Sequence, residues 1–455
     1  MRFGRILLGT VFLLLVTALA LPGVQATPPQ SEPQAAPEAQ SAAAGQEAEA
    51  APAREMREAK GYTLSPEKYE QAVTYARARY RLYFIGFVYG VLVLLFVLWR
   101  RVAPKFRDWA ERASRRRFVQ ALIYVPLLLL TLAVLGLPTN IYGQWLSLKY
   151  DQSVQSWGSW FWDWTKGQMI GMVIGIFLTW ILYGIIRRSA RRWWLYFWLA
   201  SLPILVFLLF IAPVVIQPLF FKFAPLEEKQ PVLVTEIEKV VARGGLEIPP
   251  ERMFEMKASE KLKSVNAYVT GFGASKRVVV WDTTLEKMTI PQTLFVFGHE
   301  MGHYVLYHIL KGLAFAAGVL FVFLYLGYRG LHWVLGRWGE GWSIRGVEDW
   351  ASLPVLMLLL SIFSFLSSPL VSTYSRYQEH QADVYGLQVI ADLVPDYRQA
   401  GAEAFQILGE INLADPNPSA FIKFWLYSHP PLNERIVFAE TYDPEKEPSL
   451  LPAER

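Results

Sequence analysis

A His-Glu-x-x-His pentapeptide, His299 to His303, is the first place in this chain where residue types and spacing indicate chemistry. It lies inside a run, 291–310, whose apolar spacing predicts one helix. The two imidazoles then leave the same helical face about one turn apart, as two nitrogen ligands of a tetrahedral Zn²⁺ require. Glu300 can reach a water on such a metal without ligating it, which is the position of a general base.

A second polar cluster downstream can complete such a site, since HExxH alone occurs by chance on many helices. A catalytic zinc needs a third protein ligand and an open fourth position. Glu379 and Asp383 are four residues apart on a predicted helix, so they share a face. Glu379 can ligate the metal, and Asp383 can hold the second ring nitrogen of a ligand imidazole. The predicted helices point His380 away from Glu379 and His308 away from His299, so both histidines are expected to be solvated or packed.

Further motifs accompany the two clusters. They are Pro218–Glu227, Asn266-Ala267-Tyr268, Lys276-Arg277, Asp282-Thr283 and Ser428–Arg435. With these motifs the chain, from Tyr62 to Val437, resembles the zinc CAAX prenyl endopeptidase family of the a-factor-converting type. The resemblance implies one Zn²⁺ per chain, held by His299, His303 and Glu379, with Glu300 as the base.

Candidate substrate contacts lie in two other segments. The resemblance implies that His429 and Arg435 reach into the site and contact the substrate backbone or the oxyanion. Residues 267–270 and 278–281 read as strands joined by a glycine-containing turn. An edge formed by Asn266, Ala267 and Tyr268 could hold an extended peptide through main-chain hydrogen bonds, although an ordinary hairpin would give the same pattern.

The composition places these motifs in a membrane protein. The chain has 455 residues, is 53% hydrophobic and has a mean hydropathy of +0.25, which is too apolar for an ordinary soluble protein. Six apolar segments are long enough to cross a bilayer, carry almost no internal charge and have Trp and Tyr near their ends. They are 82–99, 118–137, 168–186, 193–216, 313–333 and 353–371. The predicted fold is mainly α, a polytopic helical membrane protein with a small α+β zincin-like catalytic region. The resemblance implies that its spans enclose a chamber.

Other counts narrow the possibilities. The chain has no cysteine, which excludes disulfides and thiolate zinc sites. The formal net charge of +5 is mild and no nucleic-acid motif is visible, so the expected partners are a peptide or protein substrate and the lipid bilayer. Nothing in the sequence specifies the oligomeric state.

The domain organisation follows from these segments. Residues 1–26 read as a signal peptide, with Arg2 and Arg5 before an apolar run and small residues at its end; an uncleaved first anchor helix is the alternative. Residues 27–60 form a Pro/Ala/Glu linker without periodicity, predicted to be disordered. There follow an N-terminal helix with four spans (61–217), the catalytic region with the HExxH helix (218–312), two spans (313–375) and the third-ligand helix with a C-terminal support region (376–455).

The predicted function is that of an integral-membrane zinc metalloendopeptidase acting on membrane-associated or exported proteins. A catalytically silent membrane chaperone or partner-binding protein on the same fold is the alternative. That protein would have no need of Glu300. A coupled transporter fits less well, because charged residues are missing from the middle of the spans.

The distribution of basic residues predicts the orientation in the membrane. The loop 100–117 holds eight Lys or Arg against two acids, and 187–192 holds four Arg and no acid. The intervening loop, 138–167, has two Lys and two Asp. Positive charge in short loops marks the cytoplasmic side, so the two basic loops should lie inside and the catalytic region outside. For a bacterial inner membrane, the catalytic region would face the periplasm.

Overall fold

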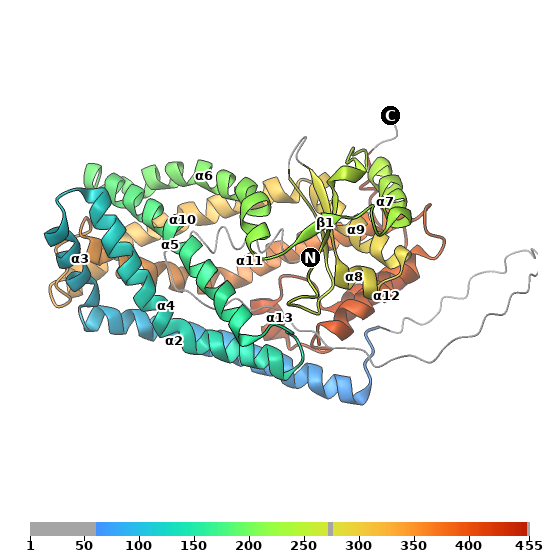
Figure 1. The fold of residues 1–455 in the computed structure, drawn as a ribbon, viewed down its shortest axis with the longest axis horizontal. Coiled ribbons are helices and arrows are strands. Elements are labelled where there is room, and N and C mark those ends of the chain that lie inside the picture. The colour runs from blue at the N-terminus through green and yellow to red at the C-terminus, as the bar shows by residue number, and fades with distance from the viewer. Residues whose placement is uncertain (1–60, 272–275, 453–455) are drawn as a thin grey trace, which may run out of the picture.

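The computed structural model describes residues 61–271 and 276–452, most of them helical (Figure 1). The predictions of a signal peptide at 1–26 and of a linker at 27–60 concern residues outside this part. Five described helices are long and apolar enough to cross a membrane, or six if α6 and the helical turns after it form one bent span. The five are α2 (Pro66–Trp99), α4 (Arg117–Lys149), α5 (Trp157–Arg188), α10 (His308–Trp338) and α11 (Leu353–Ile390). A mainly α, polytopic membrane fold is therefore confirmed.

The apolar segment 193–216, which the sequence predicts as one membrane span, is not a single helix. α6 (Trp193–Ile211) is followed by a π-helical turn, η1 (Ala212–Ile216), and a 3₁₀ turn, η2 (Gln217–Leu219). The difference has a local cause, because Pro213 has no N–H to donate and its ring clashes with the preceding turn of an α-helix. The bend brings Gln217 to the catalytic region, where its Oε1 accepts a hydrogen bond from the Tyr268 hydroxyl at 3.0 Å.

The catalytic region contains one small sheet. Its strands are β1 (Phe223–Pro225), β2 (Met253–Met256), β3 (Ala267–Thr270) and β4 (Arg277–Trp281), in the order β1-β2-β4-β3. β2 and β4 are parallel and the other two pairs antiparallel, with Tyr268 opposite Val279. The strands predicted at 267–270 and 278–281 are thus present. β3 lies at the edge of the sheet, pairing within the described residues with β4 alone.

Helices surround the sheet. α7 (Pro231–Arg243) ends at Gly244, and Gly245 has a φ of +67°, which a glycine adopts without strain. α8 (Asp282–Lys287) follows β4, and α9 (Ile290–Val305) carries the HExxH sequence. α12 (Tyr397–Ile411), α13 (Ala420–Leu426) and α14 (Leu432–Glu440) complete the C-terminal part. α11 and α12 are separate helices, since the chain turns at residues 391–396, which include Pro395.

The predicted HExxH helix, 291–310, also ends early. α9 stops at Val305, and α10 starts at His308 in a new direction. Between them Tyr307 has a φ of 57°, a left-handed conformation that costs a non-glycine residue roughly 1–3 kcal/mol. Neither glycine nor proline marks the break in the sequence, so helical periodicity alone runs through it.

The two largest hydrophobic cores of the described residues lie in different parts of the molecule. One is formed by the membrane helices α2, α4, α5, α6, α10 and the first half of α11. The other joins α7, the sheet, α9, α12, α14 and the last turns of α11. α11 therefore belongs to both cores and does not break at the predicted boundary between residues 375 and 376. It carries the third-ligand segment directly out of the membrane bundle.

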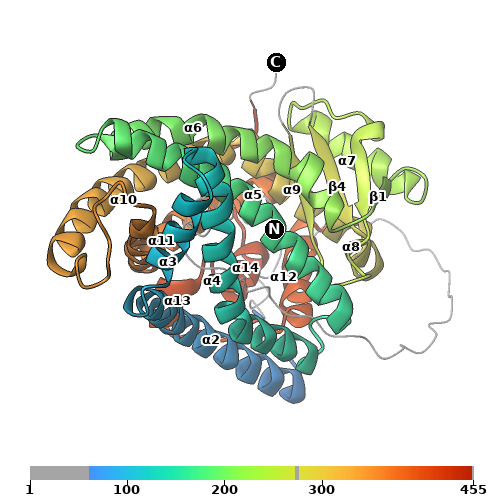
Figure 2. The same ribbon diagram turned by 60° about the vertical axis from the view of Figure 1, so that its left-hand side comes forward.

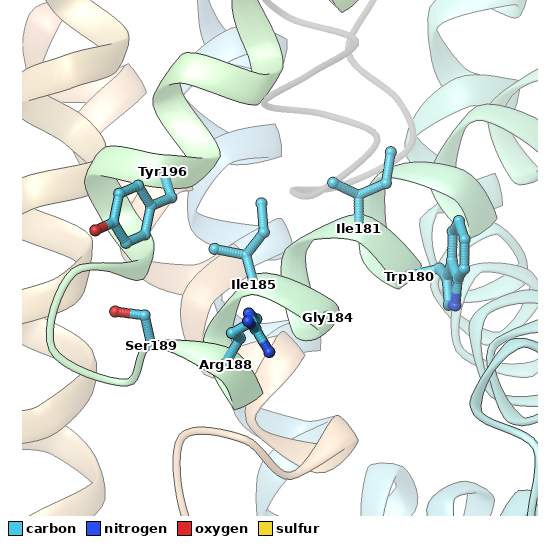
Figure 3. Close-up of a pocket in the computed structure, with 7 residues that line it drawn as sticks. All are labelled: Trp180, Ile181, Gly184, Ile185, Arg188, Ser189 and Tyr196. Carbon is cyan, nitrogen blue, oxygen red and sulfur yellow. The ribbon is translucent and has the colours of Figure 1, made fainter.

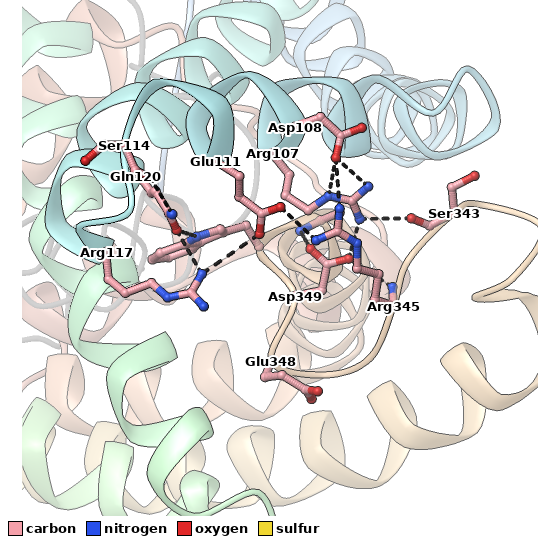
Figure 4. A network of polar contacts seen from close by, with 12 residues as sticks. Arg107, Asp108, Glu111, Ser114, Arg117, Gln120, Ser343, Arg345, Glu348 and Asp349 are labelled. Carbon is pink, nitrogen blue, oxygen red and sulfur yellow. Dashed lines mark hydrogen bonds and ion pairs between the residues drawn. The ribbon is translucent and has the colours of Figure 1, made fainter.

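The end of the bundle farthest from the sheet is held by polar contacts (Figures 1 and 4). There α3 (Val102–Ala113) meets the connection between α10 and α11. The buried Arg107 side chain pairs with Asp349, and Arg345 lies 2.7 Å from Glu111. The guanidinium of Arg187 lies 4.3 Å from the ring of Trp350. The loops 100–117, 187–192 and 339–352 thus lie together at one end, and the sheet lies at the other (Figure 2).

Candidate metal centre

Three predicted ligands converge at the junction of α9 and α11. His299 Nε2 lies 3.1 Å from His303 Nε2 and 3.4 Å from Glu379 Oε2, and His303 Nε2 lies 3.3 Å from Glu379 Oε1. Bond lengths of about 2.0–2.1 Å in a tetrahedron place ligand atoms roughly 3.3 Å apart. The three side chains, two of them completely buried, therefore fit one four-coordinate metal ion with a position left open.

Small residues allow the two helices to come this close. A Cβ on Gly386 of α11 would lie 3.0 Å from the backbone nitrogen of His299 and 3.1 Å from its Cα. A Cβ on Gly298 would lie 2.7 Å from Val389, and one on Gly302 would press on Tyr385. Without side chains at these positions, α11 can cross α9 at contact distance and bring Glu379 to the two histidines.

A charged pair orients the first histidine. His299 Nδ1 lies 2.7 Å from Asp383 Oδ1, and Asp383 is bound in turn by the buried guanidinium of Arg435. Donation from Nδ1–H to this carboxylate leaves Nε2 free to ligate a metal. Burial alone would lower the pKa of His299, but the Glu379 and Asp383 carboxylates raise it above its ordinary value. Asp383 therefore lies where the sequence predicted a carboxylate behind the ligand.

Glu300 lies beside the ligands and outside their cluster. Its Oε1 is 4.0 Å from His299 Nε2, farther than either oxygen of Glu379 from its nearest imidazole. The side chain is largely buried. This is the arrangement expected of a base that acts on a water and does not ligate the metal.

The second histidine has a neighbour that sequence reasoning missed. His303 Nδ1 lies 3.0 Å from Nδ1 of His308, which is buried, and His308 Nε2 lies 3.2 Å from Gln381 Oε1. A continuous helix would have turned His308 away from the site, whereas the break at Tyr307 turns it towards His303. The prediction that His308 does not ligate agrees with this placement, but its expected position on the helix was wrong.

The C-terminal candidates reach the same place. His429 lies in the connection between α13 and α14, with Nε2 3.4 Å from Glu379 Oε2 and Nδ1 2.9 Å from Ser428 Oγ. Arg435, on α14, is buried and contacts Asp383 and, at 3.5 Å, Glu379. Both residues thus adjoin the ligands, and contact of either with a substrate remains a prediction. His380 is half exposed and lies 3.9 Å from Glu447, away from the cluster.

The predicted peptide-binding edge packs beside the HExxH helix. Asn266 donates its N–H to Thr284 Oγ1 at 2.7 Å, and Ala267 and Tyr268 are buried. They begin β3, whose inner side packs on α9. Because β3 is the edge strand, its position is compatible with pairing to an extended peptide, which remains a prediction.

Comparison with known proteins now identifies the family. Residues 227–443 match Peptidase family M48, and residues 49–222 match the family described as CAAX prenyl protease N-terminal, five membrane helices. A Bacillus subtilis protein described as the uncharacterized metalloprotease YhfN is 36% identical over 381 residues, covering 83% of this chain and 86% of the relative. The chain belongs to peptidase family M48.

Other members of this M48 group are more distant. The human CAAX prenyl protease 1 homolog is 27% identical over 436 residues, covering 84% of this chain and 88% of its own length. The crystal structure of Ste24p from S. mikatae superposes with a TM-score of 0.70 at 24% identity, covering 82% of this chain and 88% of that one, and supports the same fold. This M48 protein is therefore a multi-pass membrane metallopeptidase, and its family implies a peptide or protein substrate and a bound metal ion.

Proposed function

We propose that the metal is Zn²⁺, one per chain, held by His299, His303 and Glu379. The observation that carries the proposal is the spacing of 3.1–3.4 Å among the three ligand atoms, which suits a tetrahedral ion with one open position. Two imidazoles and a carboxylate are a usual ligand set of catalytic zinc. Bound there, zinc would supply a Lewis acid that polarises the scissile carbonyl and acidifies a water.

The side chains of this protein supply the proton transfers. The Glu300 carboxylate accepts a proton from the attacking water and then delivers it to the leaving amine nitrogen. His429, whose Nε2 lies 3.4 Å from Glu379 Oε2, would donate from Nε2–H to the oxygen on which negative charge develops. Arg435 keeps Asp383 ionised and thereby keeps His299 in the tautomer that presents Nε2. The outer edge of β3 would align the peptide as an added strand at Ala267, between Asn266 and Tyr268.

The substrates that we propose are membrane-associated or exported proteins with an accessible extended segment. Several relatives are named CAAX prenyl proteases, but a similar protein from Bacillus subtilis is named only as a metalloprotease. A requirement for a prenyl group is therefore not part of the proposal. A catalytically silent chaperone on this fold would not need a base at Glu300.

Metal content and peptide cleavage, measured on the same purified protein, test the function. The protein should contain one zinc per chain and cleave an unfolded peptide, with loss of cleavage after chelation and recovery with zinc. Glu300→Gln should keep the zinc and lose turnover by about 10²–10⁴-fold, because an amide cannot accept the proton. Zinc-loaded protein that cleaves no peptide would favour the chaperone alternative, whereas undiminished cleavage by Glu300→Gln would contradict the role of the base.

We further propose that the catalytic end faces the outside of a bacterial inner membrane. Three connections meet at the end of the bundle opposite the sheet: 100–117, 187–192 and 339–352. This supports the prediction that the two basic loops, 100–117 and 187–192, lie on the same side of the membrane. At the other end, the start of α5 contacts the catalytic region through Asp163, which lies 2.6 Å from Lys261, and the connection before it does so through a bridge between Ser153 and Leu262. Since positive loops stay inside, this second end is outside.

A further inference from the structure

A buried histidine lies behind His303, on the side away from the other ligands. His308 has 4% of its surface exposed and begins α10, directly after the left-handed Tyr307. Its ring centroid is 5.1 Å from that of His303, and the two Nδ1 atoms are 3.0 Å apart. Gln381, two residues after Glu379 on α11, meets the opposite nitrogen of His308 at 3.2 Å.

These contacts define the direction of the hydrogen bonds. Gln381 Oε1 can only accept, so Nε2 of His308 carries the proton in this bond. In a neutral imidazole Nδ1 is then an acceptor, and the bond to it must come from Nδ1–H of His303. His303 is left with an unprotonated Nε2 that faces His299 and Glu379, as a metal ligand requires.

We propose that His308 is a positioning residue that selects the tautomer of His303 and holds its ring for the metal. The proposal rests on the zinc site proposed above. The two histidine ligands then differ: His299 is held by the charged pair of Asp383 and Arg435, and His303 by a neutral chain through His308 to Gln381. The left-handed Tyr307 is the local distortion that brings His308 into this chain.

Zinc affinity, measured by competition with a chromogenic chelator, tests this role. His308→Leu should weaken zinc binding by about 10–100-fold, the usual effect of removing such a partner. His308→Asn should recover most of the affinity, because its side-chain oxygen can accept near the position of Nδ1. His332→Leu, at an exposed position on the same helix, is the matched control and should bind zinc normally.

Thermal unfolding of the metal-free proteins separates positioning from folding. If His308→Leu is folded without metal and binds zinc like the wild type, the proposal is wrong. If that variant does not fold, Gln381→Leu decides: wild-type zinc affinity there would overturn the hydrogen-bond chain, and weakened affinity would support it. A wild-type protein that binds zinc but cleaves no peptide would contradict the proposed activity and leave this result standing.

A second, independent feature lies far from the metal. A cavity of about 750 Å³ opens between the end of α5 and the start of α6 (Figure 3). It is lined by Trp180, Ile181, Gly184, Ile185, Arg188, Ser189 and Tyr196. A Cβ built on Gly184 would meet no atom within 4 Å, so the space beside this glycine is open and forms part of the cavity.

The lining combines an apolar wall with a positive end. Trp180 and Tyr196 are about two-fifths exposed, with 40% and 42% of their surfaces accessible. Arg188 is exposed, and among the described residues it has no ion pair with a carboxylate. The adjoining loop adds Arg187, Arg191 and Arg192 without an acid.

We propose that this groove binds an anionic phospholipid. Its phosphate would lie at Arg188 and the Ser189 hydroxyl, and an acyl chain would lie along Trp180 and Tyr196 over Gly184. In a bilayer, lipid covers any apolar groove on the membrane-spanning helices. The positive charge of Arg188 and the adjoining loop favours a lipid with an anionic headgroup. The assignment requires neither the zinc site nor a particular orientation.

Lipid-dependent thermal stability in detergent tests the groove. Phosphatidylglycerol should stabilise the wild type more than phosphatidylcholine does. Arg188→Gln should lower the apparent affinity for phosphatidylglycerol about fivefold, and Gly184→Leu should fill the groove and abolish the preference. The matched controls are Gly171→Leu, also unobstructed on α5, and Arg191→Gln in the same loop outside the lining. Equal stabilisation by the two lipids, or an equal loss with Arg191→Gln, would refute the site.

Discussion

The charges around the three ligands need a cation. Glu379, Asp383 and Glu300 contribute three carboxylates within a buried cluster, and Arg435 contributes the guanidinium that contacts two of them. When all four are ionised, the sum is −2, which one divalent ion would neutralise. Buried charges are costly unless they are compensated, so the ligand set and the residues behind it form one electrostatic unit.

Replacing Glu379 should therefore remove the metal. Glu379→Ala deletes one of three protein ligands, and we expect bound zinc to fall well below one per chain in the purified protein. His380→Ala is the matched control, because His380 is adjacent in sequence but half exposed and away from the cluster. Metal analysis of the two proteins checks the assignment. If His380→Ala lost its zinc and Glu379→Ala kept full occupancy, His380 would be the third ligand and Glu379 would not.

His429 should affect turnover and leave the metal in place. Its Nε2 is next to Glu379, and its proline-flanked connection is separate from the helices that hold the ligands. Removing a single donor to a developing oxyanion usually costs about 10²–10³-fold in kcat. His429→Gln should show a loss of this order with unchanged zinc content and KM. A variant that loses its metal would instead place His429 among the residues that hold the site together.

At the scale of single residues, the sequence could predict the position of a side chain wherever that position depends only on spacing along one helix. His299, Glu300 and His303 needed only helical geometry, and Glu379 with Asp383 needed one more helix. His308 could not be placed in this way, since Tyr307 leaves the helical conformation without any glycine or proline. The pairing of Arg435 with Asp383 also depends on how α14 packs on α11, which local sequence patterns do not contain.

At the scale of elements, the crossing of α9 and α11 positions the metal centre. The apolar pattern predicts where α11 begins, but the change to polar residues after Val371 is typical of the end of a span. The structure keeps one helix through this change because an α-helix satisfies its backbone hydrogen bonds internally in lipid and in water alike. Gly386 then decides how near α11 comes to α9.

Gly386→Ala should separate the two helices. Its Cβ would lie within 3.1 Å of the His299 backbone, so a helix must shift, and overpacking of this kind costs about 1–3 kcal/mol. We expect a lower Tm and weaker zinc binding, although alanine favours a helix over glycine by about 1 kcal/mol. The control is Gly318→Ala on α10, where a Cβ meets nothing within 4 Å, and its Tm should stay the same or rise. Unchanged Tm and zinc affinity in Gly386→Ala would show that the close approach is unimportant.

At the scale of the whole molecule, the ends of the bundle have different chemistry. At one end, Arg107 pairs with Asp349 and Glu111 pairs with Arg345, which joins α3 to the connection before α11 (Figure 4). Arg187, in the second basic loop, lies against Trp350 of the same connection. The other end carries the sheet and the metal ligands. Local sequence could predict the charge of each loop, whereas their meeting at one end depends on the packing of all the spans.

The orientation of this bundle can be tested because the natural chain has no cysteine. Cysteines introduced singly by Ser449→Cys and Ala190→Cys replace exposed residues at the catalytic end and in the basic loop. In intact cells a membrane-impermeant thiol reagent should label the first protein and leave the second unlabelled, because the charge of loops 100–117 and 187–192 holds that end in the cytoplasm. Permeabilised cells are the control, in which both proteins should react. Labelling of Ala190→Cys but not Ser449→Cys in intact cells would mean that peptides reach Glu300 from the cytoplasm.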